Sequence, residues 1–370
     1  MASATIDEAS VLARFDKLVR NGTVMYAEDM EKIYHEDDDF KFEFRLTSAL
    51  KSKPPAMEDN AELDDAAVEA NGDSYASKTK NPGTDTNGNT SNGTSREIEL
   101  DADGCLPGGD ISIAGYEVGP VGETHVLSFN KFCAYRPHLL LMTADGRKRQ
   151  FEELNSGDLG AARDVLAGLN GSNGGSGQEY LVIFNCGKMG GCSRLHKHMQ
   201  VIPAPDAIPL WPDTVGSGNA EGQDPPFRFF IRRFSGSSSG NETRVLPSAD
   251  DLAKTYWQML RQATELIPGR EKVVEEDGAG RKVAVPHNVV LSERWMVVIP
   301  RVKDVVDGAG VNAAGMLGVV WASETETVDK WRRLGLKRVL GRLVFGGEER
   351  TIVAEEFHEG SAKKEKCTVK

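Results

Sequence analysis

Residues 185–203 read NCGKMGGCSRLHKHMQVIP, a glycine-rich run followed by two histidines and an apolar stretch. Successive side chains of a β-strand point to opposite faces, so this alternation places His196, His198 and Gln200 on one face. The glycines allow backbone N–H groups to approach an anion closely, and Lys188 and Arg194 add positive charge beside them. The pattern therefore indicates a phosphate chain held next to a nucleophilic imidazole.

The stretch also resembles the ATP adenylyltransferases, or diadenosine tetraphosphate phosphorylases, a branch of the histidine-triad superfamily. That branch has an Asn-x-Gly element and a Ser-Gly-x-Ser-Gln element ahead of x-His-Lys-His-x-Gln. The matching positions are Asn185, Gly187, Gly191, Ser193, His196, Lys197, His198 and Gln200. Cys192 and Arg194 depart from it, because the branch usually has Ser and Gln there. The Gly-Cys-Ser sequence is similar instead to the sister branch of galactose-1-phosphate uridylyltransferases. That branch has a proline between the two histidines, where this chain has Lys197.

Two simpler interpretations compete with nucleotidyl transfer. Cys186, Cys192, His196 and His198 lie close enough in sequence to form a Cys2His2 zinc site. The five residues between the cysteines argue against it, since structural zinc sites favour two to four. The histidines could also pack in a polar core. We expect no resident metal.

Composition limits the partners and the compartment. The 370 residues are 39% hydrophobic and 7% aromatic, as in a folded globular protein, and the net charge is −12. Such a charge argues against general binding to nucleic acid or an anionic membrane. The acidic N-terminus lacks the pattern of a signal peptide, and no apolar run is long enough to span a membrane. We therefore expect a cytoplasmic protein with reduced cysteines, and leave a nuclear location open.

Periodicity predicts an α+β fold with an antiparallel sheet and flanking helices. A capping box at residues 5–8 predicts a helix at the N-terminus, and strands are expected at 40–46, 125–132, 138–143, 180–184, 287–291 and 295–301. Residues 58–111 have few large apolar side chains, which predicts a disordered insertion. We expect a catalytic domain at 1–243 and a second domain at 244–370 with a frayed tail. The family resemblance implies a histidine-triad-like pseudo-dimer whose halves share one sheet.

The resemblance extends to other segments and implies further nucleotide contacts. Lys53 ends an element similar to Leu-x-x-Lys-Pro, and Asn130 and Lys131 belong to a Leu-Asn-Lys-Phe-like strand. The sequence of residues 287–301 also resembles strands of the family, which implies that Asn288, Met296 and Arg301 contact the ligand. For Lys53, the alternative that it is simply a solvated surface lysine is equally good. For Asn130 and Lys131, the alternative is that they are polar residues at the end of a strand, next to its turn.

The resemblance implies a covalent mechanism. The second histidine of the motif, His198, would attack the α-phosphorus, and a backbone carbonyl would fix the tautomer of its ring. His196 would orient the site, while Gln200, Ser193 and the backbone of Gly191, Cys192 and Arg194 would bind phosphate oxygens with Asn185 nearby. Diadenosine tetraphosphate and phosphate would then give ADP and ATP, reversibly. Mg²⁺ would accompany the polyphosphate.

Two other functions stay open from the sequence. One is hexose-1-phosphate nucleotidyl transfer, which the Gly-Cys-Ser wording favours. The other is a non-catalytic protein that binds or senses nucleotides with the same pocket.

Overall fold

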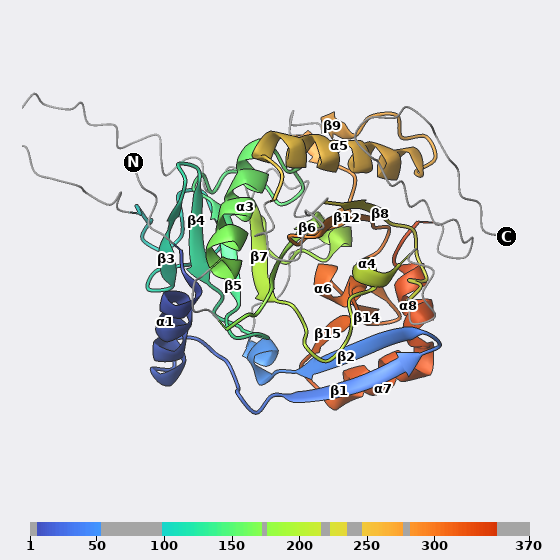
Figure 1. Ribbon diagram of the computed structural model, residues 1–370, viewed down its shortest axis with the longest axis horizontal. Coiled ribbons are helices and arrows are strands. Elements are labelled where there is room, and N and C mark those ends of the chain that lie inside the picture. Colours follow the sequence, from blue (N-terminus) through green and yellow to red (C-terminus); the bar gives the residue numbers. More distant parts are fainter. Residues whose placement is uncertain are drawn as a thin grey trace, which may run out of the picture.

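The computed structural model describes residues 6–52, 98–171, 176–215, 223–234, 246–276 and 282–345. At its centre is an eight-stranded sheet in which every neighbouring pair is antiparallel (Figure 1). Its strands, in spatial order, are β3 (Glu117–Val121), β4 (His125–Phe129), β5 (Leu139–Thr143), β7 (His198–Pro203), β6 (Tyr180–Cys186), β11 (His287–Leu291), β12 (Trp295–Pro300) and β8 (Phe230–Arg233). The predicted α+β class and antiparallel sheet are confirmed. The sheet is also shared, since β6 pairs with β11 from the later part of the chain.

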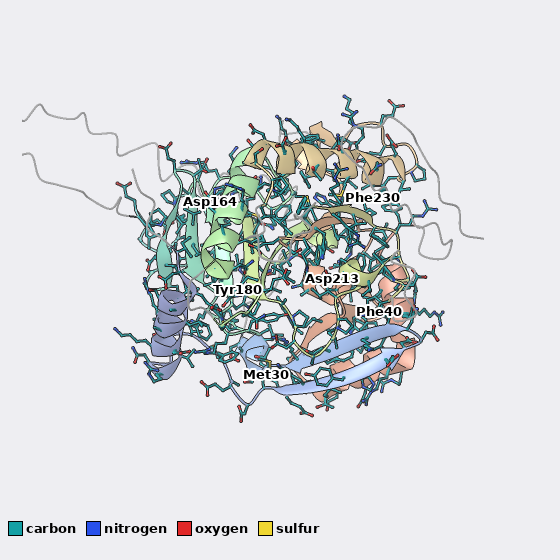
Figure 2. The ribbon with its side chains drawn as sticks, viewed as in Figure 1. Met30, Phe40, Asp164, Tyr180, Asp213 and Phe230 are labelled. Atoms are coloured by element: carbon teal, nitrogen blue, oxygen red, sulfur yellow. The ribbon has the colours of Figure 1, made fainter. Side chains whose placement is uncertain are left out.

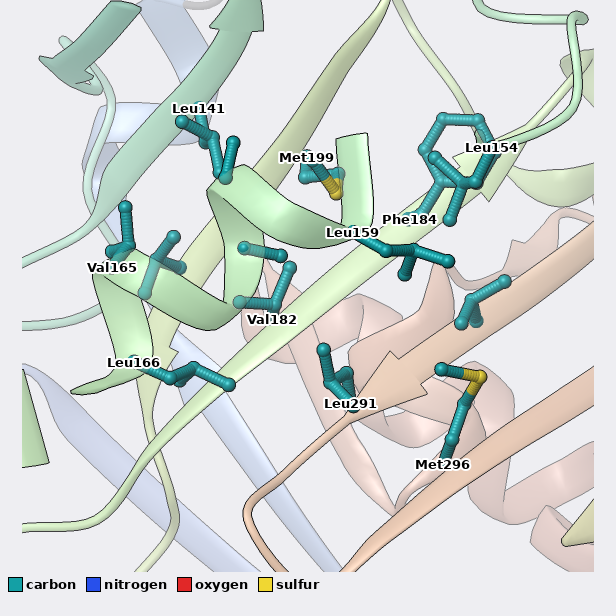
Figure 3. Packing of buried hydrophobic residues seen from close by; sticks show 14 of the residues in the cluster. Leu141, Leu154, Leu159, Val165, Leu166, Val182, Phe184, Met199, Leu291 and Met296 are labelled. Atoms are coloured by element: carbon teal, nitrogen blue, oxygen red, sulfur yellow. The ribbon is translucent and has the colours of Figure 1, made fainter. Parts of the chain in front are cut away.

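Three amphipathic helices cover one face of this sheet, here called the helix face. Alternate residues of the strands supply its core, so that Met199 of β7 packs with Val182 of β6 and Leu291 of β11 (Figure 3). The covering helices are α1 (Glu8–Arg20), α3 (Ser156–Asn170) and α5 (Ala249–Glu265).

The opposite face, here called the motif face, is covered in part by a second layer. Strand β2 of a hairpin from the early part of the chain pairs in parallel with β15 from its later part, so the blue hairpin and the orange-red β15 lie side by side (Figure 1). Phe40, Phe42 and Phe44 of that hairpin are fully buried in this layer. The layer contains β1 (Glu31–Asp37), β2 (Phe40–Leu46), β15 (Val319–Ala322), α4 (Trp211–Thr214), α6 (Ala313–Met316), α7 (Thr325–Leu334) and α8 (Leu336–Arg342). Asp213 of α4 accepts hydrogen bonds from Arg294 and Trp295, which fastens α4 to the β11–β12 hairpin (Figure 2).

A third cover lies over β4 and β5 on the motif face and corrects one expectation. Residues 98–113 have few regular hydrogen bonds, but Leu106 and Ile113 are buried against Val126, Leu140 and Met142. The predicted disorder of 58–111 is therefore wrong for 98–111, because the apolar residues at this end of the range are buried against the sheet. The remaining part of that prediction, 58–97, lies outside the described residues.

Helix starts follow local capping chemistry. Asp7 is the N-cap of α1 and accepts a hydrogen bond from the Ser10 backbone, so Asp7 has the role expected of Thr5. Asn155 and Asp158 form a capping box at α3, and Ser248 caps α5 as its sequence predicts. Short elements complete the fold: η1 (Ser48–Ser52), η2 (Lys188–Gly190), β9 (Val274–Glu276), β10 (Lys282–Ala284), β13 (Val305–Val306) and β14 (Ala309–Gly310).

Both large cores contain residues from before and after position 243. The division into 1–243 and 244–370 stays a prediction, and packing crosses it extensively. Among the described residues, no helix is long and apolar enough to cross a membrane.

Candidate active site

The glycine-rich loop joins β6 to β7 and is pressed against the later part of the chain. Gly187 and Gly191 have φ angles of 69° and 84°, which side chains other than glycine rarely adopt. A Cβ at Gly191 would lie 2.8 Å from the carbonyl oxygen of Val311, so the close approach also requires glycine. The loop therefore takes its shape partly from its own backbone and partly from residues 311–312.

A buried polar network supports this loop from below. The side chain of Asn288 donates to the Asn185 side chain (2.9 Å) and to the Gly190 carbonyl (2.6 Å). Arg301 donates in turn to Asn288 (2.6 Å) and to the Val311 carbonyl (3.1 Å). Burial lowers the pKa of the Arg301 guanidinium to about 9.

These contacts revise the roles expected of three residues. Asn185, Asn288 and Arg301 were expected to bind nucleotide, yet each is at most 3% exposed and donates to or accepts from protein groups. The hydrogen bonds of this network fix the positions of its members, which holds the backbone rigid. We therefore assign them the support of the loop.

His198 begins β7 with its backbone and ring both fixed. The side chain of Gln150 accepts from the His198 N–H (2.7 Å) and donates to the carbonyls of His198 and Asn185. The Nδ1 atom of His198 lies 2.8 Å from the carbonyl oxygen of His196. A carbonyl can only accept, so Nδ1 carries the proton and the lone pair of the neutral ring is on Nε2.

His196 has a different environment although it lies on the same face. Its ring is fully buried, and Nε2 donates to the Thr143 carbonyl (2.8 Å). Its Nδ1 atom is buried without a hydrogen-bond partner among the described residues. Burial lowers the pKa of this imidazole to about 4, which keeps it neutral near pH 7. His196 thus acts on His198 through its backbone carbonyl.

Gln200 is oriented by a histidine whose role the sequence did not reveal. His138 Nε2 lies 2.8 Å from Gln200 Oε1, while the Ala134 N–H points to His138 Nδ1 at 3.4 Å. Because Nδ1 accepts from Ala134, the proton of the neutral His138 ring is on Nε2, which donates to the amide oxygen of Gln200. The NH₂ group of Gln200 therefore points away from His138. Asn130 lies beside the same ring, with its Nδ2 atom 3.4 Å from His138 Nε2.

The remaining predicted contacts are spread along the loop and the sheet. Ser193 and Arg194 are half-buried, Cys192 is buried and Lys131 is exposed. Among the described residues, no hydrogen bond engages the Ser193 hydroxyl, and Arg194 donates to the Ser193 carbonyl (2.7 Å). Lys53 lies outside the described residues.

Two side chains lie on the helix face, away from the motif. Met296 is fully buried there beside Leu291 (Figure 3), so its expected role as a ligand contact is wrong. Cys186 is also buried in the helix-face core, whereas His198 points to the motif face, so the two side chains cannot form the Cys2His2 set. In the described parts of the chain, no three His, Cys, Asp or Glu side chains are grouped as a metal ion would require.

Lys197 anchors the motif from behind. Its side chain crosses to the helix face and donates to Asp158 of α3 (2.7 Å), which also accepts from His125 (3.0 Å). All three are at most 3% exposed. Burial alone would raise the pKa of Asp158, but hydrogen bonds from His125 and Lys197 lower it below its ordinary value.

Comparison with known proteins agrees with this architecture. Residues 113–212 match the Ap4A phosphorylase N-terminal domain, and residues 223–346 match the ATP adenylyltransferase C-terminal domain. The chain belongs to the ATP adenylyltransferase family. The first match contains the glycine-rich loop and both histidines, and the second contains the β11–β12 hairpin that supports the loop.

Individual relatives come from Saccharomyces cerevisiae. Diadenosine 5',5'''-P1,P4-tetraphosphate phosphorylase 2 is 26% identical over 220 residues, which is 56% of this chain and 65% of the relative. Protein APA1 is also 26% identical, over 57% of this chain and 65% of its own length. The matched region thus spans slightly less than two thirds of either relative.

Solved structures show the same fold. Yeast Ap4A phosphorylase Apa2 superposes with a TM-score of 0.61 at 18% identity, over 93% of this chain and 99% of that chain. Apa2 in complex with Ap4A gives 0.59 at 20% identity, over the same shares. At this identity the likeness establishes the fold alone.

Proposed function

We propose that this protein is a nucleotidyltransferase that phosphorolyses diadenosine tetraphosphate. His198 Nε2 attacks one α-phosphorus, the bond from that phosphorus to the bridging oxygen breaks, and ATP leaves. Inorganic phosphate then attacks the AMP bound to His198, which releases ADP and restores the imidazole. The reverse sequence makes the dinucleotide from ATP and ADP.

One observation carries this proposal: the hydrogen bond from His198 Nδ1 to the His196 carbonyl (2.8 Å). It places the lone pair on Nε2, on the motif face, without the need for a separate base. A neutral imidazole in a fixed tautomer is a nucleophile near neutral pH, and a covalent intermediate divides one difficult displacement into two easier ones.

Other groups around His198 fit the handling of phosphate oxygens. The NH₂ group of Gln200, the hydroxyl of Ser193 and the backbone at Gly191 are donors that need not reorganise during the reaction. We propose that Arg194, Lys131 and Lys53 add positive charge, Cys192 contributes through its backbone, and Asn130 contacts the substrate. Mg²⁺ would enter with the polyphosphate as part of the substrate.

The yeast relatives support the choice of substrate, since one is named as a diadenosine tetraphosphate phosphorylase and Apa2 has been solved with AMP and with Ap4A. Small-molecule nucleotides are accordingly the partners we propose. A cytoplasmic location is part of the same proposal.

Phosphorolysis of labelled diadenosine tetraphosphate tests the proposal. Purified protein with phosphate should give ADP and ATP in equal amounts, and the matched His198→Ala protein should give neither. Tight binding without products would support the nucleotide sensor instead. Products formed only when galactose 1-phosphate replaces phosphate would support hexose-1-phosphate transfer.

A further inference from the structure

Asp110 makes an unexpected contact with the motif. Its two carboxylate oxygens accept hydrogen bonds from consecutive backbone N–H groups, one from Leu195 and one from His196, both at 2.8 Å. A carboxylate repels phosphate, so a negative group here is costly for binding a polyphosphate. Its place in the site therefore calls for a role other than contact with the substrate.

The packing of residues 98–113 fixes the position of the Asp110 carboxylate. Leu106 and Ile113 anchor the segment in the core on either side of Asp110. The backbone of Gly109 lies directly against His196, because a Cβ at Gly109 would be 2.6 Å from Nδ1 of that ring. Gly146 packs on Gly109 as closely, and a Cβ there would be 2.3 Å from the Gly109 nitrogen. The contact is thus built by several close approaches that only glycine allows.

A short chain of contacts connects Asp110 to the nucleophile. Asp110 holds the peptide on the N-terminal side of His196 through its N–H. The peptide on the C-terminal side presents its carbonyl to His198 Nδ1, and its own N–H, from Lys197, donates to the Lys148 carbonyl (2.9 Å). Both peptides that flank the His196 Cα are therefore fixed, and the acceptor for the His198 ring cannot rotate away.

We propose that Asp110 is a positioning residue for His198. It holds the 195–196 backbone so that the His196 carbonyl keeps the proton of the His198 ring on Nδ1 and the lone pair on Nε2. The consequence for rate rests on the proposed nucleotidyl transfer, whereas the consequence for the tautomer does not. Without the carboxylate, the backbone on either side of His196 keeps only its hydrogen bonds with Gln150 and Lys148. These hold the His196 carbonyl less closely, and His198 populates both tautomers.

The tautomer of His198 is the first measurement. Nitrogen NMR of the full chain, labelled at the imidazole nitrogens, distinguishes a protonated Nδ1 from a protonated Nε2, and the signals lost in His198→Gln identify the residue. At about pH 8.5, where an ordinary histidine is neutral, wild type should be protonated on Nδ1. Asp110→Ala and the milder Asp110→Asn should show a mixture. Unchanged His198 signals in both variants would overturn the proposal.

The second measurement is the single-turnover transfer of labelled AMP to the protein from diadenosine tetraphosphate without phosphate. Asp110→Ala should lower the rate constant about 10- to 100-fold, as expected for misplacement of a reacting group, with little change in KM. Asp103→Asn is the matched control, since it removes an exposed charge from the same segment, and should react like wild type. A wild-type rate in Asp110→Ala at saturating Mg²⁺, with a higher Mg²⁺ requirement, would make Asp110 a metal contact and overturn the proposal. If wild type itself takes up no AMP, the proposed function fails, and the tautomer measurement still decides the role of Asp110.

Discussion

The two faces of strand β7 handle polar groups in opposite ways. On the motif face, the Nδ1 atom of His198 and the amide oxygen of Gln200 are each fixed by a protein partner. The other polar atom of each side chain is turned to the site. On the helix face, Lys197 ends in a buried ion pair with Asp158 that a third residue, His125, completes. The alternation of the strand thus places the polar groups of the candidate site on one face and the buried ion pair that anchors the strand on the other. The position of His198 is therefore fixed from both faces of the strand.

The largest effect should come from the motif face. His198→Ala removes the attacking nitrogen, for which no neighbour can substitute, so turnover should fall by a factor of roughly 10³ or more. Wild type should retain AMP as an acid-labile phosphoramidate when phosphate is omitted. Formation of that adduct by the variant would show that another residue is the nucleophile and would remove the basis of the comparison.

The helix face should give the largest effect on stability. Lys197→Met leaves Asp158 buried without its cation, and breaking a buried pair in this way costs about 3–5 kcal/mol of the free energy of unfolding. Urea denaturation measures this cost. The double variant Lys197→Met with Asp158→Asn should recover part of it, because the uncompensated charge is gone. Equal stability of the single variant and wild type would mean that the ion pair does not anchor the motif.

Acid sensitivity should arise from both faces, because each has a buried histidine whose pKa is lowered. Burial lowers the pKa of His196 on the motif face and of His287 on the helix face to about 4, from an ordinary 6.5. Between these values the unfolded chain binds protons that the folded protein does not, so stability should fall as pH drops from 6.5 to 4. Each histidine should contribute roughly 3 kcal/mol over that range and little below it.

The free energy of unfolding in urea, measured at intervals of pH, tests this linkage. His196→Gln and His287→Gln should each remove about half of the pH-dependent part. A flat profile for wild type between pH 4 and 6.5 would mean that neither imidazole is kept neutral by burial.

The smallest effect is expected at the loop position that departs from the family. Cys192→Ser should change the rate of phosphorolysis by no more than a few fold, because the loop acts mainly through backbone groups. Steady-state kinetics with wild type as the reference checks this. Combined loss of activity and of bound zinc would revive the metal interpretation.

Local patterns predicted what depends on neighbours in sequence. The alternation of His196, His198 and Gln200 and most of the strands are such features, because a strand fixes the direction of each side chain. The role of Asn185 was not predictable in this way, since its partner Asn288 lies 103 residues further along the chain. Burial of that pair turns two apparent ligand contacts into loop supports.

Composition failed for a related reason. It averages over a window, and residues 58–111 as a whole are mostly polar, so disorder was predicted even for residues 98–111, where four large apolar side chains occur. Leu106 is buried against an apolar surface that the sheet provides, and Ile98, Leu100 and Ile111 pack beside it. Asp110 and His138 act on residues far away in sequence, and no signal in the sequence points to these contacts.

The contact between Gly191 and Val311 has a consequence for protein synthesis. A ribosome that has completed β7 has already made both histidines. However, strand β11, which pairs with the other edge of β6, and the backbone at Val311 that supports the loop have not yet been translated. The nascent chain therefore carries the nucleophile without a formed loop to receive phosphate. On the proposed function, competence for nucleotidyl transfer requires translation at least through Val311. Shorter products of interrupted translation are therefore expected to be inert toward nucleotides.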